Sequence, residues 1–305
     1  MLQKIKKALT NPRLLGIYLL SKLAVLFPDK LYLQLMFRLK MGYWMDFDNP
    51  QTFNEKLQWL KLYNRRPEYT QMVDKYAVKE YVANIIGDEH IIPTLGVWDS
   101  VDDIDFDKLP NQFVLKTTHG GGGGGVVICK DKSQFDVEQC KIKLQQSLDS
   151  CIYINLREWP YKDVPRRIIA EQYMVDESGY ELKDYKFFCF DGVPKALFIA
   201  SDRGNPTEET KFDFFDTEFN HLPFTNGHPN STKPVLKPKG FEEMKKLAGK
   251  LSQNLPHARI DFYDINGQIY FGEITFFHWG GVVPFEPIEW DYAFGSWLTL
   301  PEKQN

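Results

Sequence analysis

An unbroken run of six glycines, Gly120–Gly125, is the feature that most limits how this chain can fold. It lies between two short apolar segments with the character of strands, Phe113–Leu115 and Val126–Ile128, and Lys116 follows the first of them. Glycine loses much backbone entropy on folding, so such a run is unfavourable unless the backbone must lie close against another group. A strand, a glycine loop and a second strand form a hairpin that can cover a phosphate, with a lysine at its base. The alternative is a flexible linker, although linkers usually carry serine and are rarely bounded by strands.

Composition and missing motifs exclude several classes of protein. The formal net charge of −4 gives no electrostatic basis for binding nucleic acid. The four cysteines show no CxxC spacing and are expected to be reduced thiols in a cytoplasmic protein, not disulfides or zinc ligands. The GxxxxGK[ST], GxSxG and HExxH patterns and the kinase motifs are absent, which removes the commonest nucleotide-binding and hydrolase alternatives.

The N-terminal segment combines basic and apolar residues. Lysines at positions 4, 6 and 7 precede an apolar stretch from Leu14 to Phe27 that Ser21 and Lys22 interrupt and Pro28 ends. The stretch is too short and too polar to span a bilayer, and it has no evident small-residue cleavage site of a signal peptide. It can lie on a membrane surface as a peripheral contact, or it can form an amphipathic helix that packs on the body of the protein.

Helical patterns dominate the first hundred residues. Apolar residues recur on one face of Leu31–Met41, and Thr52 with Glu55 forms a capping-box signature before an amphipathic helix. A further helix is predicted from Val73 to Ala83, ended by Gly87. We place the first domain boundary in the acidic segment Asp99–Asp107 that follows a strand-like segment at 96–98.

Hairpin patterns dominate the remainder. A strand at 168–170 leads into Glu171, and an Asp-Gly turn at 191–192 joins two apolar runs, 182–190 and 194–200. After an exposed loop over 217–239 and a helix over 241–255, Asn266-Gly267 joins the strands 258–263 and 269–275. Because the strands are joined by hairpins and not by βαβ crossovers, the pattern predicts an α+β architecture.

Two carboxylates lie on the last hairpin. A turn centred on Asn266-Gly267 sets Asp261 opposite Gly272 and leaves Glu273 one position away. A bulge or a one-residue change of register would bring both carboxylates to one face. Together with a hydroxyl they would suit Mg²⁺, which prefers oxygen ligands and nucleotide phosphates. The alternative is that both are ordinary polar positions on a half-exposed sheet.

Several fragments in this order resemble the ATP-grasp ligases, specifically the TupA-like proteins of teichuronopeptide biosynthesis. They span nearly the whole chain, and it is their combination that is specific: NPQTFNEKLQWLKLY (49–63), VDKYAVKEYV (73–82), FVLKTTHGGGG (113–123), RIIAEQY (167–173), DYKFFCFDGVPK (184–195), ARIDFY (258–263), IYFGEITFF (269–277) and PIEWDYAFGSWLTLP (287–301).

The resemblance implies an ATP-grasp fold, in which two α+β lobes sandwich the nucleotide, preceded by a mostly helical region. The expected divisions are 1–107 for the helical region, 108–175 for the small lobe with the glycine loop, and 176–305 for the large lobe with the metal-binding hairpin. Arg259 and Lys186 are the implied catalytic residues. The implied Mg²⁺ ligands are Asp261, Glu273 and Thr275. The implied ATP-binding residues are Lys75, Lys116, Lys186, His119, Gly120, Gly121, Gly122, Gly123, Glu171, Gln172 and Tyr173.

Within this set, the lysines would contact phosphates, and Glu171 to Tyr173 would run along the adenine. His119 would contact phosphate or substrate, or make a structural hydrogen bond. The sequence departs from many ATP-grasp enzymes at Thr275, where asparagine is usual, and its glycine loop lacks the common serine. Residues Arg166, Arg167, Asp202, Arg203 and Trp279 are candidates for the substrate pocket, with surface or core roles as the alternative.

The implied reaction converts a carboxylate to an acyl phosphate, which an amine attacks to give an amide, ADP and phosphate. The expected cofactors are ATP and Mg²⁺. The expected substrates are a carboxylated sugar or polysaccharide precursor and an amino acid or amine, in surface polysaccharide biosynthesis. The alternatives are a kinase-like or glycosyltransferase-associated enzyme of the same pathway, and a nucleotide-binding protein that has lost its chemistry.

Overall fold

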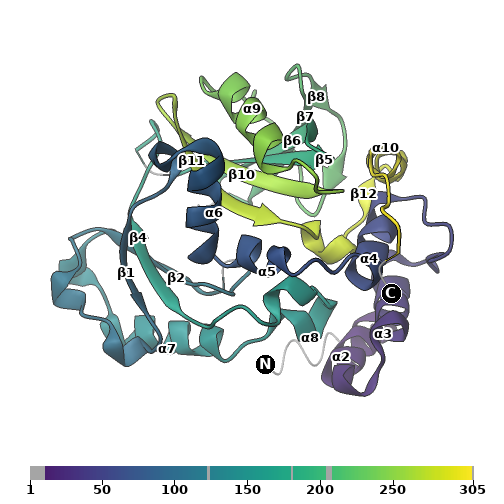
Figure 1. The fold of residues 1–305 in the computed structure, drawn as a ribbon, viewed down its shortest axis with the longest axis horizontal. Coiled ribbons are helices and arrows are strands. Elements are labelled where there is room, and N and C mark those ends of the chain that lie inside the picture. Colours follow the sequence, from purple (N-terminus) through teal and green to yellow (C-terminus); the bar gives the residue numbers. More distant parts are fainter. Residues whose placement is uncertain (1–10, 122–123, 180, 204–207, 304–305) are drawn as a thin grey trace.

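Two antiparallel sheets divide the computed structural model into two lobes (Figure 1), and the structure describes residues 11–121, 124–179, 181–203 and 208–303. The smaller sheet has the strand order β1-β4-β2-β3. Its strands are β1 (Thr94–Trp98), β2 (Phe113–Thr117), β3 (Val126–Cys129) and β4 (Ile168–Gln172). The structure therefore places β1 in this sheet, although β1 precedes the boundary that we predicted near residue 107.

The larger sheet has the order β11-β10-β5-β6-β7-β8. Its strands are β5 (Asp184–Phe190), β6 (Val193–Ser201), β7 (Lys211–Asp216), β8 (His221–Leu222), β10 (Ala258–Ile265) and β11 (Gln268–Thr275), and two short strands, β9 (Thr225–Asn226) and β12 (Phe285–Glu286), pair separately. The turns at Asp191-Gly192 and Asn266-Gly267 have positive φ at both positions, as the tight hairpin turns of such dipeptides require. The predicted α+β class with hairpin connections is confirmed.

The helices of the described residues are α2 (Pro12–Lys22), α3 (Asp29–Met41), α4 (Phe53–Tyr63), α5 (Glu68–Val73), α6 (Ala77–Ile86), α7 (Val137–Leu148), α8 (Ile152–Leu156), α9 (Phe241–Leu251) and α10 (Glu289–Trp297). Helix α7 packs on β2 and β3 of the small sheet, and α9 packs on β5 and β6 of the large one (Figure 1). The large lobe thus receives helices from both ends of the chain.

The main hydrophobic core joins α4, α5 and α6 to the six-stranded sheet, and a second core fills the small lobe. Helix α4 begins at the predicted capping box: the Thr52 side chain accepts from the Glu55 backbone N–H, and the Glu55 carboxylate accepts from the Thr52 N–H. Its apolar face buries Phe53 and Leu57 in that core. The helical region before residue 94 is therefore packed onto the large lobe.

The helix predicted from Val73 to Ala83 is broken in the structure. Asp74 is extended and caps α6, because its carboxylate accepts from the backbone N–H groups of Tyr76 and Ala77. Aspartate side chains compete with the backbone in this way, and they favour turns and caps over helix interiors. The break places Lys75 in a turn.

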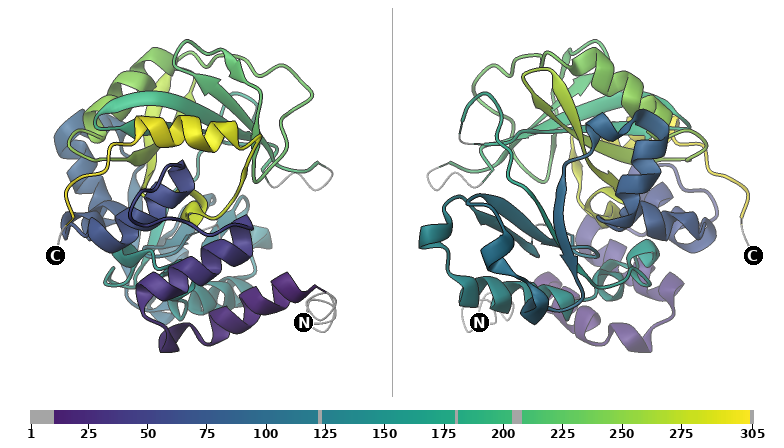
Figure 2. Two further views of the ribbon diagram at one scale, coloured as in Figure 1. Left: turned by 90° about the vertical axis from the view of Figure 1, so that its right-hand side faces the viewer. Right: turned by 60° about the vertical axis from the view of Figure 1, so that its left-hand side comes forward.

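Helices α2 and α3 pack against each other and form one end of the molecule, apart from the large sheet (Figure 2). Their contact buries a small cluster of Leu20, Ala24, Tyr32 and Met36. Among the described residues, no helix combines the length and the hydropathy needed to cross a bilayer.

Candidate active site

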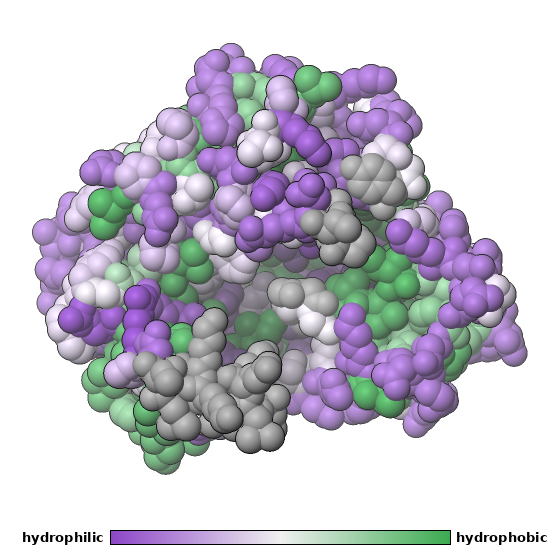
Figure 3. Space-filling model, turned by 180° about the vertical axis from the view of Figure 1, so that it is seen from behind, coloured by the Kyte–Doolittle hydropathy of each residue, from purple (hydrophilic) through white to green (hydrophobic). Residues whose placement is uncertain are grey.

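A cleft of about 940 Å³ lies between the two sheets and opens on the face shown in Figure 3. Both lobes contribute to it: β2, the glycine loop and β4 from the small lobe, and β5, β10 and β11 from the large lobe. The cleft brings together most of the site residues that the resemblance implied, namely Lys75, Lys116, Gly120, Gly121, Glu171, Gln172, Tyr173, Lys186 and Glu273.

The glycine loop connects β2 and β3 as a hairpin in which Lys116 pairs with Val126. At its base the hydroxyls of Thr117 and Ser147 are 2.7 Å apart. A Cβ on Gly125 would lie 2.2 Å from the Ser147 Oγ, and one on Gly120 would lie 2.4 Å from the Thr117 Oγ1. These two glycines are therefore needed for close packing against α7, and Gly122 and Gly123 lie outside the described residues.

Three lysines and a glutamate line the small-lobe side of the cleft. The Glu171 carboxylate forms ion pairs with Lys79 Nζ at 2.7 Å and with Lys116 Nζ at 2.5 Å. Burial alone would raise the pKa of Glu171, but the charges of Lys116 and Lys79 lower it below its ordinary value. The Lys75 ammonium donates to the carbonyl of Gly120 and so fixes the start of the loop. In this state Glu171 neutralises cations; its implied contact with adenine remains a prediction.

The hairpin of β10 and β11 contains the predicted change of register. Asp261 pairs with Glu273 across β10 and β11, while the next residue, Phe262, pairs with Phe271. Gly272 is the extra residue of this bulge, so the two carboxylates come to lie directly opposite each other.

Both carboxylates are matched by cations. Arg259 Nη2 lies 2.7 Å from the Asp261 Oδ2, 3.0 Å from the Glu273 Oε1 and 3.0 Å from the Thr275 Oγ1. The Lys186 ammonium contacts Asp261 directly and lies 3.9 Å from Glu273. Burial would raise the pKa of Glu273, but Lys186, Arg259 and Lys75 outweigh it and hold that pKa well below its ordinary value.

This donor set suits a hard divalent cation. Two carboxylates and a hydroxyl converge on the same guanidinium nitrogen, and oxygen ligands of this kind are those that Mg²⁺ prefers. The Glu273 side chain is 38% exposed and faces the cleft. Within the described ranges no group of three or more acidic, histidine or cysteine side chains is placed to hold a metal ion, so ligands from a bound phosphate would be needed to complete a coordination shell.

A buried chain of hydrogen bonds that links Arg259, His278 and Asn226 was not predicted from the sequence. Arg259 Nη1 donates to His278 Nδ1 at 2.9 Å, so that ring must donate through Nε2, which lies 2.8 Å from the Asn226 Oδ1. Burial and the nearby Arg259 charge hold the pKa of His278 well below its ordinary value, so the ring is neutral at pH 7. His278 and Asn226 therefore fix the orientation of the guanidinium. Asn226 lies in a segment that the sequence presents only as a loop, and no local signal marks it.

Two further cleft residues were missed, although spacing offered a signal for each. Lys79 follows Lys75 by four residues, which is one helical turn, and it faces the same cleft. Asp184 precedes Lys186 by two residues on β5, so both side chains lie on one face of the strand, with 3.4 Å between them. Arg203 also contacts Asp184.

His119 lies outside the cleft. His119 is buried, with its Nε2 3.1 Å from the Ser147 carbonyl, and it does not line the cleft; of its two alternatives, the structure favours the structural hydrogen bond.

Among the pocket candidates, Asp202 and Arg203 line the cleft. Arg166 donates to the carbonyl of Leu148, and Arg167 pairs with Asp74 at 2.9 Å. Trp279 is 39% exposed and stands beside the ring of Phe212. Only the first two therefore border the nucleotide-sized cleft.

Comparison with known proteins gives a family match and several distant structural matches. The family model described as TupA-like ATPgrasp matches residues 55–299. D-alanine–D-alanine ligase from Bacillus anthracis is similar at 18% identity with a TM-score of 0.38, over 67% of this chain and 56% of that chain. The D-alanine–D-alanine ligase of Helicobacter pylori gives 16% identity, a TM-score of 0.41 and coverage of 81% and 69%. L-amino acid ligase from Bacillus licheniformis gives 12% identity, a TM-score of 0.47 and coverage of 85% and 57%. No curated protein sequence matched the chain significantly.

Proposed function

Because this chain belongs to the TupA-like ATP-grasp family, we propose that it is an ATP- and Mg²⁺-dependent ligase that joins a carboxylate to an amine. The observation that carries the proposal is the pairing of buried Asp261 with Glu273, which lines the cleft, in contact with Lys186 and Arg259. Paired carboxylates beside fixed cations are the arrangement that phosphoryl transfer requires, since catalysis there depends on positioning and charge stabilisation.

In this proposal the nucleotide occupies the cleft between the sheets. Lys75, Lys116 and Lys186 supply positive charge to its phosphates, and the glycine loop covers them. Gln172 and Tyr173, at the end of β4, border the adenine. Binding of phosphates would draw Lys116 away from Glu171, so the buried carboxylate would retain Lys79 as its partner.

Asp261, Glu273 and Thr275 are the proposed Mg²⁺ ligands. When bound, the ion would neutralise charge on the transferring phosphate. Arg259 is already desolvated and fixed by His278, so it costs little reorganisation to stabilise the phosphoryl group during transfer.

The proposed reaction has two steps. A substrate carboxylate oxygen attacks the γ-phosphorus of ATP, the bond from that phosphorus to the bridging oxygen breaks, and ADP leaves. The amine then attacks the carbonyl carbon of the acyl phosphate. Inorganic phosphate leaves and carries with it the carboxylate oxygen that had attacked phosphorus, and the nitrogen loses a proton to give the amide. Both displacements are favoured by holding the reacting groups together in one cleft.

We propose a sugar carboxylate or carboxylated polysaccharide precursor as the acceptor and an amino acid as the amine, in the synthesis of a surface polysaccharide. Support for this substrate class comes from the family resemblance. The cleft contributes the charged side chains of Arg203 and Asp202 near its large-lobe rim.

The test measures ADP release by the full chain with ATP, Mg²⁺, a panel of uronic acids and a panel of amino acids. We expect ADP only when both substrates are present, with a product whose mass equals their sum less one water. Asp261→Asn should abolish turnover, and Glu289→Gln, at an exposed position remote from the cleft, should leave it unchanged. A stable sugar phosphate formed without amine would identify a kinase, and full turnover by Asp261→Asn would refute the metal assignment.

A further inference from the structure

A continuous apolar face covers the end of the molecule that α2 and α3 form. It includes the short 3₁₀ turn Ala24–Leu26, where Val25 and Leu26 are 77% and 72% exposed. Figure 3 shows hydrophobic surface over these helices at its lower left. We call this the apolar face, and its members are Leu14, Tyr18, Leu19, Leu23, Val25, Leu26 and Leu31, each at least 40% exposed.

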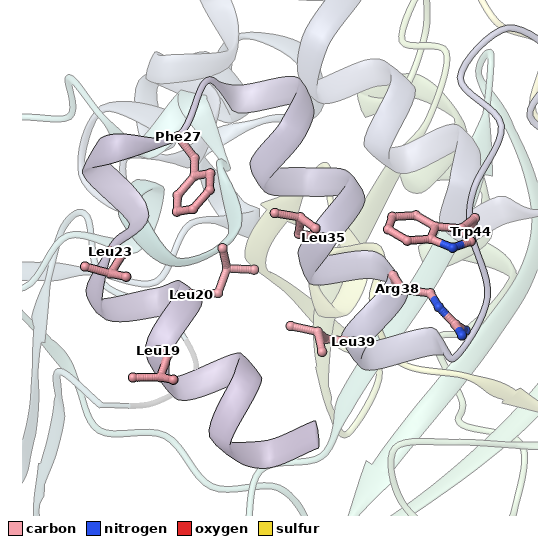
Figure 4. Close-up of a pocket in the computed structure, with 8 residues that line it drawn as sticks. All are labelled: Leu19, Leu20, Leu23, Phe27, Leu35, Arg38, Leu39 and Trp44. Atoms are coloured by element: carbon pink, nitrogen blue, oxygen red, sulfur yellow. The ribbon is translucent and has the colours of Figure 1, made fainter. Parts of the chain in front are cut away.

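A groove of about 430 Å³ between α2 and α3 continues the apolar face (Figure 4). Leu20, Phe27, Leu35 and Leu39 point into the space between the helices, and Arg38 and Trp44 lie on the far side of α3. Within α2 only Leu20 is fully buried, and Leu14, Tyr18 and Leu19 are 40%, 49% and 48% exposed. Contiguous apolar surface of this kind marks a binding surface, because isolated exposed leucines are common and clustered ones are not.

Basic residues outnumber acidic ones in the helices that carry the apolar face. The described residues 11–45 contain five lysines and arginines (Arg13, Lys22, Lys30, Arg38 and Lys40) and one acidic residue, Asp29, whereas the whole chain has a net charge of −4. Asp29 is already paired, with Arg65 at 2.7 Å and Arg157 at 2.9 Å. Lys22 and Lys30 are exposed beside the apolar residues. The helices that carry the apolar face therefore have an excess of basic charge, in a chain that is acidic as a whole.

We propose that the apolar face binds the surface of an anionic lipid bilayer. Leucine side chains would enter the boundary between headgroups and acyl chains, and the surrounding lysines and arginines would meet lipid phosphates. Two copies of the face would bring like charges together, which disfavours a homodimer through it. In this proposal the segment lies along the bilayer surface. The proposal rests on this surface alone and does not depend on the proposed ligase activity.

The experiment measures co-sedimentation of the full chain with vesicles of phosphatidylcholine alone and of phosphatidylcholine mixed equally with phosphatidylglycerol. We expect binding to the mixed vesicles and its loss at high salt. The double variant Val25→Ser/Leu26→Ser should bind at least about tenfold more weakly, because two exposed apolar side chains no longer enter the bilayer. Lys22→Gln/Lys30→Gln should weaken binding about thirtyfold, since each lysine near an anionic surface contributes a factor of about five.

Leu236→Ser is the matched control, because Leu236 is 82% exposed but lies in the loop between β9 and α9. It should bind as the wild type does. Unchanged circular dichroism would show that each variant folds. The proposal is overturned if Val25→Ser/Leu26→Ser binds vesicles as tightly as the wild type, or if the wild type binds neither vesicle. It is also overturned if light scattering finds a dimer of the wild type, and Val25→Ser/Leu26→Ser abolishes that dimer but leaves vesicle binding unaffected.

Discussion

The histidines His257 and His278 are buried in the large lobe, and we predict that they make the fold lose stability in mild acid. His257 is enclosed by the rings of Phe53 and Phe190, each with its centroid 4.9 Å away. Its Nδ1 lies 3.0 Å from the Cys189 carbonyl and donates to it. Burial lowers the pKa of His257 to about 3, and burial together with Arg259 holds the pKa of His278 well below its ordinary value.

The sign and size of the effect follow from linkage. A histidine in the unfolded chain has a pKa of about 6.5. Below that pH the histidines of the unfolded chain bind protons, whereas the buried histidines of the folded chain stay neutral. The stabilising contribution of His257 is thus complete above about pH 6.5 and is lost progressively as the pH falls toward about 3. At pH 5, about 1.5 units below the unfolded pKa, the loss from His257 is about 2 kcal/mol, and His278 adds a loss of the same sign. Domains are stable by only about 5–15 kcal/mol, so the change is measurable.

The assay is urea unfolding followed by tryptophan fluorescence at several pH values from 7 to 5. His257→Asn keeps a donor for the Cys189 carbonyl but does not titrate in this range, so it should start less stable at pH 7 and lose about 2 kcal/mol less than the wild type on going to pH 5. Carboxylates contribute equally to both curves, and the difference between the curves isolates the histidine. Parallel curves for wild type and His257→Asn would refute the reasoning.

Three further predictions concern packing, capping and positioning. Gly295→Ala places a Cβ 2.2 Å from a backbone oxygen of the segment before α4, so urea unfolding should show a loss of about 3 kcal/mol, whereas Gly124→Ala, in open space, should change stability by less than about 1 kcal/mol. Thr52→Ala removes the capping box of α4 and should cost about 1 kcal/mol in the same assay; an unchanged midpoint would contradict this. His278→Leu removes the acceptor that holds Arg259, so kcat should fall about tenfold or more with little change in KM for ATP; a change in KM alone would contradict a positioning role.

The features that the sequence predicts well are set by short-range chemistry. Asn266-Gly267 fixes the turn of the last hairpin, and the bulge at Gly272 then brings Asp261 opposite Glu273, as the need for one shared face suggested. The capping box at Thr52 is likewise local. The glycine loop is predicted as a hairpin because both flanking strands are readable from their β-branched residues.

The features that the sequence does not predict depend on distant segments. Asn226, Arg259 and His278 meet only because β9, β10 and the turn after β11 converge in the fold. The periodic spacing of apolar residues could not reveal the break at Asp74. An aspartate side chain interrupts a helix only where it accepts hydrogen bonds from the backbone N–H groups of the next residues, and that depends on the turn they form. The double ion pair of Glu171 requires α6 and β2 to approach β4, which is a matter of tertiary packing.

The charges of the cleft are balanced within the protein, and this balance constrains how its variants should be interpreted. Each carboxylate at the site touches at least one cation, so removing either partner leaves a desolvated charge that destabilises the fold as well as the reaction. An inactive Asp261→Asn protein therefore supports a metal role only if its unfolding midpoint is close to the wild type, or if Lys186→Gln, which breaks the same ion pair, leaves more activity than Asp261→Asn does. The pairs concerned are Lys79 and Lys116 with Glu171, Lys186 and Arg203 with Asp184, and Lys186 and Arg259 with Asp261 and Glu273.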